Sequence, residues 1–279
     1  MRTVNRYSVS LTVVTAIVVS SGAGMAQTNQ DRPLVSQAQY DQWLIYLSNW
    51  GRWGEDDEIG ALNLINPQKR RAAARLVTEG FSVSLASTAQ TEATVDNPCP
   101  INWEMVTASP GGASDRVAYP CIHGPGTTHI DGFAHRFFDG KMWNGVPIAD
   151  TVTMESGASR NSILTMKHGI VTRGVLYDIP RLRGHDYVDP SQPVQGWDLQ
   201  DWASKVGVEP RDGDAVLIRS GSDSFWAANP TFEFSFPPNT PGNAPSIIEY
   251  LYDTNAALLG WDLQEAGHRA HEYLSLIHI

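Results

Sequence analysis

The sequence has few charged residues and lacks several familiar motifs. Asp, Glu, Lys and Arg make up 18% of its 279 residues, which argues against a disordered or coiled-coil protein. No Gly-x-Ser-x-Gly elbow occurs, which disfavours a serine hydrolase, and no Gly-x-Gly-x-x-Gly, which disfavours a dinucleotide enzyme. Acidic residues outnumber basic ones, and the net charge of −10 makes nucleic acid an unfavourable partner. A hydrophobic content of 42%, with 9 tryptophans, is ample for a folded core.

Long apolar runs are scarce as well, and the notable one lies near the N-terminus. Arg2 and Arg6 precede the apolar stretch 11–19, and Gly24 and Ala26 are the small residues of a cleavage site. The stretch is shorter than the roughly 20 residues needed to cross a bilayer. We therefore expect residues 1–26 to be a signal peptide; the alternative is an anchor that stays attached. The mature protein is then expected to be secreted, periplasmic in a bacterium, and free of the membrane.

Only two cysteines occur, Cys99 and Cys121, and both adjoin prolines. A disulfide between them is compatible with an oxidising compartment. The alternative is a pair of buried free thiols. The residues alone do not decide between the two.

The order of the predicted elements indicates an α/β fold. The length favours one large domain, which we place at 48–279, after an arm and short helix at 27–47. Asn66-Pro67 is typical of a helix start, and we expect that helix to turn Leu76 and Val77 inward and to end at Gly80. An irregular excursion is expected at 86–115. The other predicted elements are strands at 81–85, 170–179, 215–219 and 256–260, and helices at 40–47, 199–206 and 246–254.

The most informative stretch is a histidine-rich segment with an aspartate inside it. His123, His129 and His135 fall within 13 residues, and Asp131 lies two residues after His129. On an extended chain, side chains at i and i+2 point to the same face. Neutral imidazole and carboxylate are ordinary ligands for zinc or manganese. The segment therefore predicts a metal site, and the alternative is a polar loop whose histidines cap nearby carbonyl groups.

The same segment, Thr128-His129-x-Asp131-x-x-x-His135, resembles the motif His-x-Gly-Thr-His-x-Asp-x-x-x-His of the cyclase family, which includes bacterial kynurenine formamidase and isatin hydrolase. The resemblance extends over about residues 48–275. Further segments similar to members of this family are 49–57, 60–63, 138–145, 173–178 and 213–219.

The resemblance implies a swivelling β/β/α fold, assembled as a homo-oligomer of two or four subunits. It implies one or two divalent ions, Zn²⁺ or Mn²⁺, and the opening of cyclic amides or cleavage of formamides. By the same resemblance His129 and Asp131 are metal ligands, and His135 is the acid/base histidine beside the metal.

The sequence departs from the family pattern at two places. The first histidine of the motif would fall on Pro125, so we take His123 as the replacement ligand, with a hydrogen-bonding role in the pocket as the alternative. The late histidine of the family corresponds to His271, with His268 as its rival. A later acidic or amide residue has no counterpart, so we expect the C-terminal end of the domain to be incomplete.

These features predict metal-assisted hydrolysis of a C–N bond in a small-molecule substrate, an aromatic or cyclic amide. A substrate pocket is predicted from the aromatic residues in or near the motif segments, which could instead be core or interface residues: Trp50, Trp53, Trp103, Phe133 and Trp143. Two rival functions remain open. One is a lactone or carbamate hydrolase with the same site, and the other is a non-catalytic periplasmic protein that binds a metal and a ligand.

Overall fold

The computed structural model describes residues 32–95, 97–123, 126–233 and 240–263. The chain divides into two units, Met1–Leu34 and Val35–Ile279, and the elements below all lie in the second unit. The α-helices are α1 (Gln37–Tyr46), α2 (Pro67–Ala74), α3 (Ile179–Arg183), α4 (Gly196–Val206), α5 (Ser222–Ala228) and α6 (Ile247–Asp253). The strands are β1 (Asn102–Ser109), β2 (Gly112–Ala118), β3 (Val152–Thr153), β4 (Gly157–Ala158), β5 (Gly174–Asp178), β6 (Ala215–Arg219) and β7 (Leu258–Trp261). Three short 3₁₀ helices are η2 (Gly60–Leu64), η3 (Trp143–Gly145) and η4 (Ile163–Met166).

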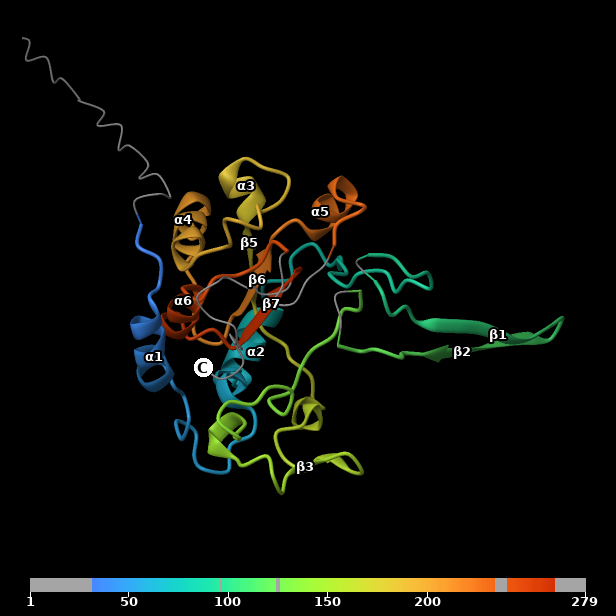
Figure 1. Cartoon of the computed structure of the whole chain (residues 1–279), viewed down its shortest axis with the longest axis horizontal. Helices are drawn as coiled ribbons and strands as arrows, with labels where there is room; N and C mark the ends of the chain where they lie inside the picture. Colours follow the sequence, from blue (N-terminus) through green and yellow to red (C-terminus); the bar gives the residue numbers. More distant parts are fainter. Residues whose placement is uncertain (1–31, 96, 124–125, 234–239, 264–279) are drawn as a thin grey trace, which may run out of the picture. The chain divides into compact units, whose positions relative to one another are not determined.

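A three-stranded parallel sheet lies at the centre of this unit, in the order β5-β6-β7 (Figure 1). Parallel neighbours need crossover connections, and helices α3 to α6 lie in those connections. Tyr177 of β5 is fully buried, and its hydroxyl lies 2.9 Å from the hydroxyl of Tyr250 on α6. The indole of Trp202 on α4 donates to the carbonyl oxygen of Leu176 at 2.8 Å. The main core is therefore formed between one face of the sheet and helices α4 and α6.

The mixed α/β architecture predicted from the sequence is confirmed. Strand β6 has the predicted bounds, and α2 begins as expected, because the Asn66 side chain accepts a hydrogen bond from the backbone N–H of Lys69. The helix predicted at 246–254 is α6, and β5 forms within the strand predicted at 170–179. Among the described residues no helix is long and apolar enough to cross a membrane.

Two local predictions were wrong. Residues 81–85 form no strand, and the side chains of Phe81, Val83 and Leu85 are largely exposed. Alternation of apolar and polar residues makes a strand only where a partner strand completes its hydrogen bonds, and no described strand pairs there. Helix α2 ends at Ala74 rather than near Gly80, and Leu76 and Val77 are exposed because they follow its end.

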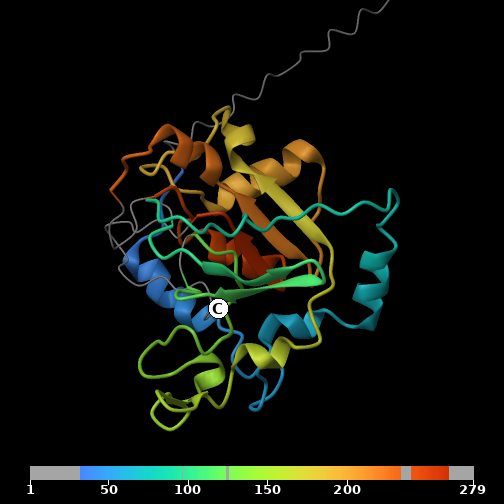
Figure 2. The same cartoon turned by 90° about the vertical axis from the view of Figure 1, so that its right-hand side faces the viewer.

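The excursion expected to be irregular contains an antiparallel ribbon, β1 and β2. The ribbon extends away from the other elements of its unit (Figure 1) and points toward the viewer in Figure 2. All of its residues are exposed. Cys99 and Cys121, just outside its two ends, are joined by a disulfide, so the first of the two alternatives for the cysteines is the one observed.

Candidate metal centre

Three of the predicted residues meet at one point of the second unit. His123, His129 and Asp131 each offer a ligand atom, and these atoms lie within 4.8 Å of one another. Residues 128–132 belong to no helix or strand, and His129 and Asp131, separated by one residue in this segment, both direct a polar atom into the cluster. The cluster is partly open to solvent, since the His129 and Asp131 side chains are 23% exposed and that of His123 is 51% exposed.

The carboxylate of Asp131 is the centre of the cluster. Its Oδ1 lies 2.8 Å from His123 Nδ1 and 3.6 Å from His129 Nε2. Although the first distance is short, the atoms lack hydrogen-bond geometry, and Oδ1 is buried without a hydrogen-bond partner. A buried carboxylate oxygen that two ring nitrogens approach without forming hydrogen bonds is the arrangement expected of ligands that converge on a cation. The donor set of two imidazoles and a carboxylate fits zinc or manganese.

His129 is oriented by a backbone contact on the far side of its ring. Its Nδ1 lies 2.6 Å from the carbonyl oxygen of Thr127. A carbonyl oxygen only accepts, so Nδ1 carries the proton and Nε2 presents a lone pair to the cluster. A hydrogen bond on the second ring nitrogen is the usual way in which proteins orient a metal-ligating histidine.

His135 joins the cluster from beyond a turn in which its backbone N–H donates to the carbonyl of Gly132. Its ring stacks on that of His123 with centroids 4.1 Å apart, and its Nε2 lies 3.6 Å from Oδ2 of Asp131. Burial is the largest influence and lowers the pKa of His135 below 6.5; Asp131 opposes this, and the neighbouring His123, Arg136 and His129 add to it. The imidazole is therefore neutral at pH 7 and able to accept a proton.

Residues 126–135, here called the ligand segment, contact residues 160–163, which the sequence analysis did not single out. The backbone N–H of Ala134 donates to the carbonyl of Asn161 at 3.0 Å. The Asn161 backbone N–H donates to the Glu58 carboxylate at 2.7 Å, and its side chain donates to the carbonyl of Trp143 at 3.0 Å. A Cβ on Gly132 would lie 2.8 Å from the backbone nitrogen of Ile163, so this contact requires glycine. These contacts hold the segment between His129 and His135 in place.

The predicted aromatic residues are divided between packing and exposed positions. Trp143 is 2% exposed, stacks on Phe133 with centroids 4.8 Å apart, and donates its indole N–H to Asp57. The ring centroids of Trp53 and Trp143 are 6.5 Å apart, and the Trp50 ring lies beside Gly145. Trp103 is apart from them on the exposed ribbon, where it donates to Asp115. Trp143 therefore has the contacts of a core residue, and Trp50, Trp53 and Phe133 are the partly exposed members of the group.

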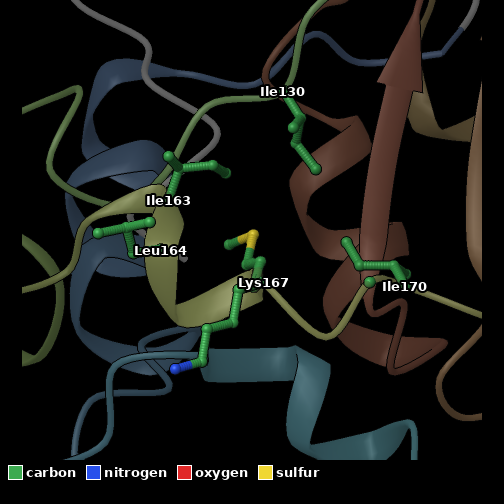
Figure 3. A pocket seen from close by; sticks show the side chains of 7 residues that line it. Ile130, Ile163, Leu164, Lys167 and Ile170 are labelled. Atoms are coloured by element: carbon green, nitrogen blue, oxygen red, sulfur yellow. The ribbon is translucent and has the colours of Figure 1, made fainter.

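An aliphatic cavity of about 360 Å³ lies beside the ligand segment (Figure 3). Its lining residues are Ile130, Ile163, Leu164, Met166, Lys167, Gly169 and Ile170. Ile130 separates His129 from Asp131 in the sequence, so its side chain points away from the two ligands and toward this cavity. None of the described residues that line the cavity is aromatic, so in this respect the cavity differs from the pocket predicted from the sequence.

His271 and its rival His268 lie outside the described residues, so the structure gives no place to the predicted late ligand. Among the described residues, the candidate ligands that come together are His123, His129 and Asp131, with His135 alongside.

The fold and the site define an α/β protein with a histidine–aspartate cluster that could hold a divalent ion. Residues 82–268 match the family described as "Putative cyclase", and the chain belongs to this family. It is similar to a crystal structure described as a novel cyclase, with 27% identity and a TM-score of 0.67 over 78% of this chain and 76% of the other. The search of curated proteins found no significant match.

Proposed function

We propose that this protein is a metal-dependent hydrolase that cleaves the C–N bond of an amide, formamide or cyclic amide. The observation that carries the proposal is the convergence of His123, His129 and Asp131 around a buried carboxylate oxygen without a hydrogen-bond partner. Membership of the cyclase family supports it. The proposed specificity resembles that of kynurenine formamidase or isatin hydrolase, with a small aromatic or cyclic amide as substrate.

His123, His129 and Asp131 would hold the ion, which we propose to be Zn²⁺ or Mn²⁺. A bound divalent ion supplies Lewis acidity, which polarises a carbonyl group and lowers the pKa of water toward about 7. The Thr127 carbonyl keeps the lone pair of His129 Nε2 directed at the cluster. Asp131 presents Oδ1 to the other two ligands and leaves Oδ2 on the side of His135.

His135 would move the proton in this reaction. Its ring is neutral at pH 7 because burial lowers its pKa, so it can accept a proton from the attacking water. The protonated ring can then donate to the leaving nitrogen, which departs poorly as an anion. Two other groups would contact the substrate: the half-exposed aromatic residues Trp50, Trp53 and Phe133, and the aliphatic cavity behind Ile130.

The test is a substrate panel combined with one ligand variant. The purified protein is assayed with added Zn²⁺ or Mn²⁺ against N-formyl anilines, cyclic imides and lactones. We expect hydrolysis of an amide class, together with loss of both bound metal and activity in Asp131→Ala. Turnover of lactones alone would favour the rival ester-type hydrolase. Stoichiometric metal without any turnover would favour a binding protein, and undiminished metal in Asp131→Ala would refute the site.

We also propose that the protein is exported and that residues 1–26 are removed. The Cys99–Cys121 disulfide supports this, because disulfides persist in oxidising compartments. Expression in a bacterium followed by fractionation and N-terminal sequencing tests it. A periplasmic product that begins at Gln27 is expected, whereas an unprocessed product in the cytoplasm or membrane would contradict it.

A further inference from the structure

Of the three candidate ligands, His123 has the fewest described contacts that would orient its side chain. Its ring contacts Asp131, His129 and His135, all members of the same cluster. In the described chain no carbonyl group orients the His123 ring in the way that Thr127 orients His129. The His123 side chain is also the most exposed of the three. Its position therefore depends on the backbone that carries it.

That backbone is fixed two residues earlier by the disulfide. Cys121 follows the exposed ribbon and is bonded to Cys99, which precedes it, with the two Cα atoms 5.9 Å apart. A two-stranded ribbon is marginally stable alone, so it offers little support at the point where the chain returns. The disulfide instead ties the return to the 87–101 loop, of which all but residue 96 is described.

The 87–101 loop contacts the ligand segment at two further points. The backbone N–H of Ser87 donates to the side-chain oxygen of Thr128, the residue before His129, at 2.9 Å. Asn97 packs so closely on Gly126 that a Cβ there would lie 2.2 Å from the Asn97 side-chain oxygen. The same loop therefore contacts the chain beside His123 and beside His129.

The loop is itself well braced. Asn97 is buried, and its side-chain amide donates to the carbonyl groups of Gln90 and Glu92. The backbone N–H of Ile101 donates to the carbonyl of Gln90 at 3.1 Å, which closes the loop next to Cys99. A cross-link to a loop with these internal hydrogen bonds restricts the positions open to Cys121 and therefore to His123.

We propose that the Cys99–Cys121 disulfide and the 87–101 loop form a positioning device of the metal centre, which places His123 against Asp131. The inference rests on the proposed function, because it assumes that this cluster binds a divalent ion. Groups that orient a ligand typically change metal affinity by about 10–100-fold when removed. We expect a loss of that size when the disulfide is opened, and we expect it to act through His123.

A double-mutant cycle tests this. Zn²⁺ affinity is measured by competition with a chromophoric chelator for the wild type, Cys99→Ser/Cys121→Ser, His123→Ala and the combined variant, at a temperature where all are folded. If the disulfide acts by placing His123, its removal costs about 10–100-fold in the wild type and little in the His123→Ala background. Equal losses in both backgrounds, or no loss in either, would overturn the inference while leaving the metal site intact. No binding by the oxidised wild type would overturn the proposed function itself.

A second variant keeps the question answerable if the disulfide-free protein folds poorly. Gly126→Ala should displace Asn97 and weaken Zn²⁺ binding with the disulfide intact. Gly111→Ala in the ribbon turn is the matched control, because the nearest atom to its added Cβ lies 4.0 Å away. The absorption bands of bound Co²⁺ give an independent readout of the ligand set. They should change in Gly126→Ala and remain unchanged in Gly111→Ala; unchanged bands and affinity in both would contradict the role of the loop.

Discussion

His135 lies in the cluster but on a different side of Asp131 from the two candidate ligand histidines, so its proposed catalytic role can be tested apart from metal binding. Its Nε2 lies on the Oδ2 side of Asp131, whereas His123 and His129 approach Oδ1. We therefore expect His135→Ala to retain the metal and to lose about 10²–10⁴-fold in kcat, the usual range for general acid–base catalysis. Metal analysis and steady-state kinetics on the same preparation check this. Loss of the metal together with activity would make His135 a ligand instead.

Individual residues differ in how far the sequence could predict their roles. That His129 and Asp131 lie close together could be predicted, because two-residue spacing on an extended chain places side chains on the same face without any knowledge of the fold. Glu58 and Asn161 could not, because they act through backbone hydrogen bonds between segments about 100 residues apart. For Trp143 the sequence left a pocket role and a core role open, because composition does not show which tryptophan is buried; the side chain is 2% exposed.

At the scale of elements, the ligand segment depends on its contact with residues 160–163. Gly132→Ala would place a Cβ 2.8 Å from Ile163 N and 3.1 Å from the Asn161 carbonyl oxygen, both backbone atoms that cannot move aside. We expect a loss of about 1–3 kcal/mol in the free energy of unfolding, the usual range for overpacking, and weaker metal binding as well. Chemical denaturation and metal titration measure the two effects. Gly111→Ala is the control, and equal stability of the two variants would contradict the prediction.

Asp214 links α2 to the parallel sheet through ion pairs and hydrogen bonds. It is 1% exposed and receives hydrogen bonds from Lys69 of α2, Arg173 before β5 and the backbone N–H of Arg211. Burial alone would raise the pKa of Asp214, but the hydrogen bonds from Arg173, Lys69 and Arg211 hold it below 3.8. Folding therefore favours the carboxylate, and its stabilisation is complete above pH 3.8 and disappears as the pH falls through the lower native pKa.

We expect Asp214→Asn to lower the free energy of unfolding by about 1–3 kcal/mol at neutral pH, because it removes the charged hydrogen-bond partner of the partly buried Lys69 and Arg173. Urea titrations at neutral pH and at about pH 3 measure this. The difference between variant and wild type should shrink at the lower pH. A constant difference would show that the charge of Asp214 is not what stabilises the contact.

The elements that could be predicted from the sequence are those with a local cause. Strand β6 is a mainly apolar run, and α2 begins at Asn66-Pro67, where the Asn66 side chain accepts a hydrogen bond from the backbone N–H of Lys69. The β1–β2 ribbon was missed because its prolines and glycines, typical of loops, lie at its turn and just outside its ends. Residues 81–85 have strand character but no described partner, and pairing is a property of the whole fold.

At the scale of the whole molecule, the α/β class follows from the order of helices and strands in the sequence. The contacts that hold the candidate site in place do not follow from that order. The ligand segment is held on one side by the disulfide-linked 87–101 loop and on the other by residues 160–163. Neither support is part of the parallel sheet. The motif therefore predicts the candidate ligands, whereas their placement depends on loop contacts that the motif does not include.

The exposed β1–β2 ribbon is a candidate surface for contact between subunits. One face of the ribbon carries Asp115, which accepts a hydrogen bond from the Trp103 indole. The apolar side chains around Asp115 on this face are those of Trp103, Val117 and Met105. These three side chains are 46–50% exposed, while the opposite face carries the Glu104–Arg116 ion pair. A two-stranded ribbon needs further packing to be stable, and its apolar face is the one that a neighbouring subunit would cover.

We expect the protein to form dimers or tetramers and Val117→Lys to weaken them, because the variant places a charge on the apolar face that association would bury. Asn102→Lys adds the same charge at the same end of the ribbon but on the opposite face, so it serves as the matched control. Light scattering coupled to size exclusion over a range of concentrations measures the mass of each protein. A monomeric wild type would refute the assembly. An equal effect of the two lysines would show that charge in general, rather than the apolar face, governs association.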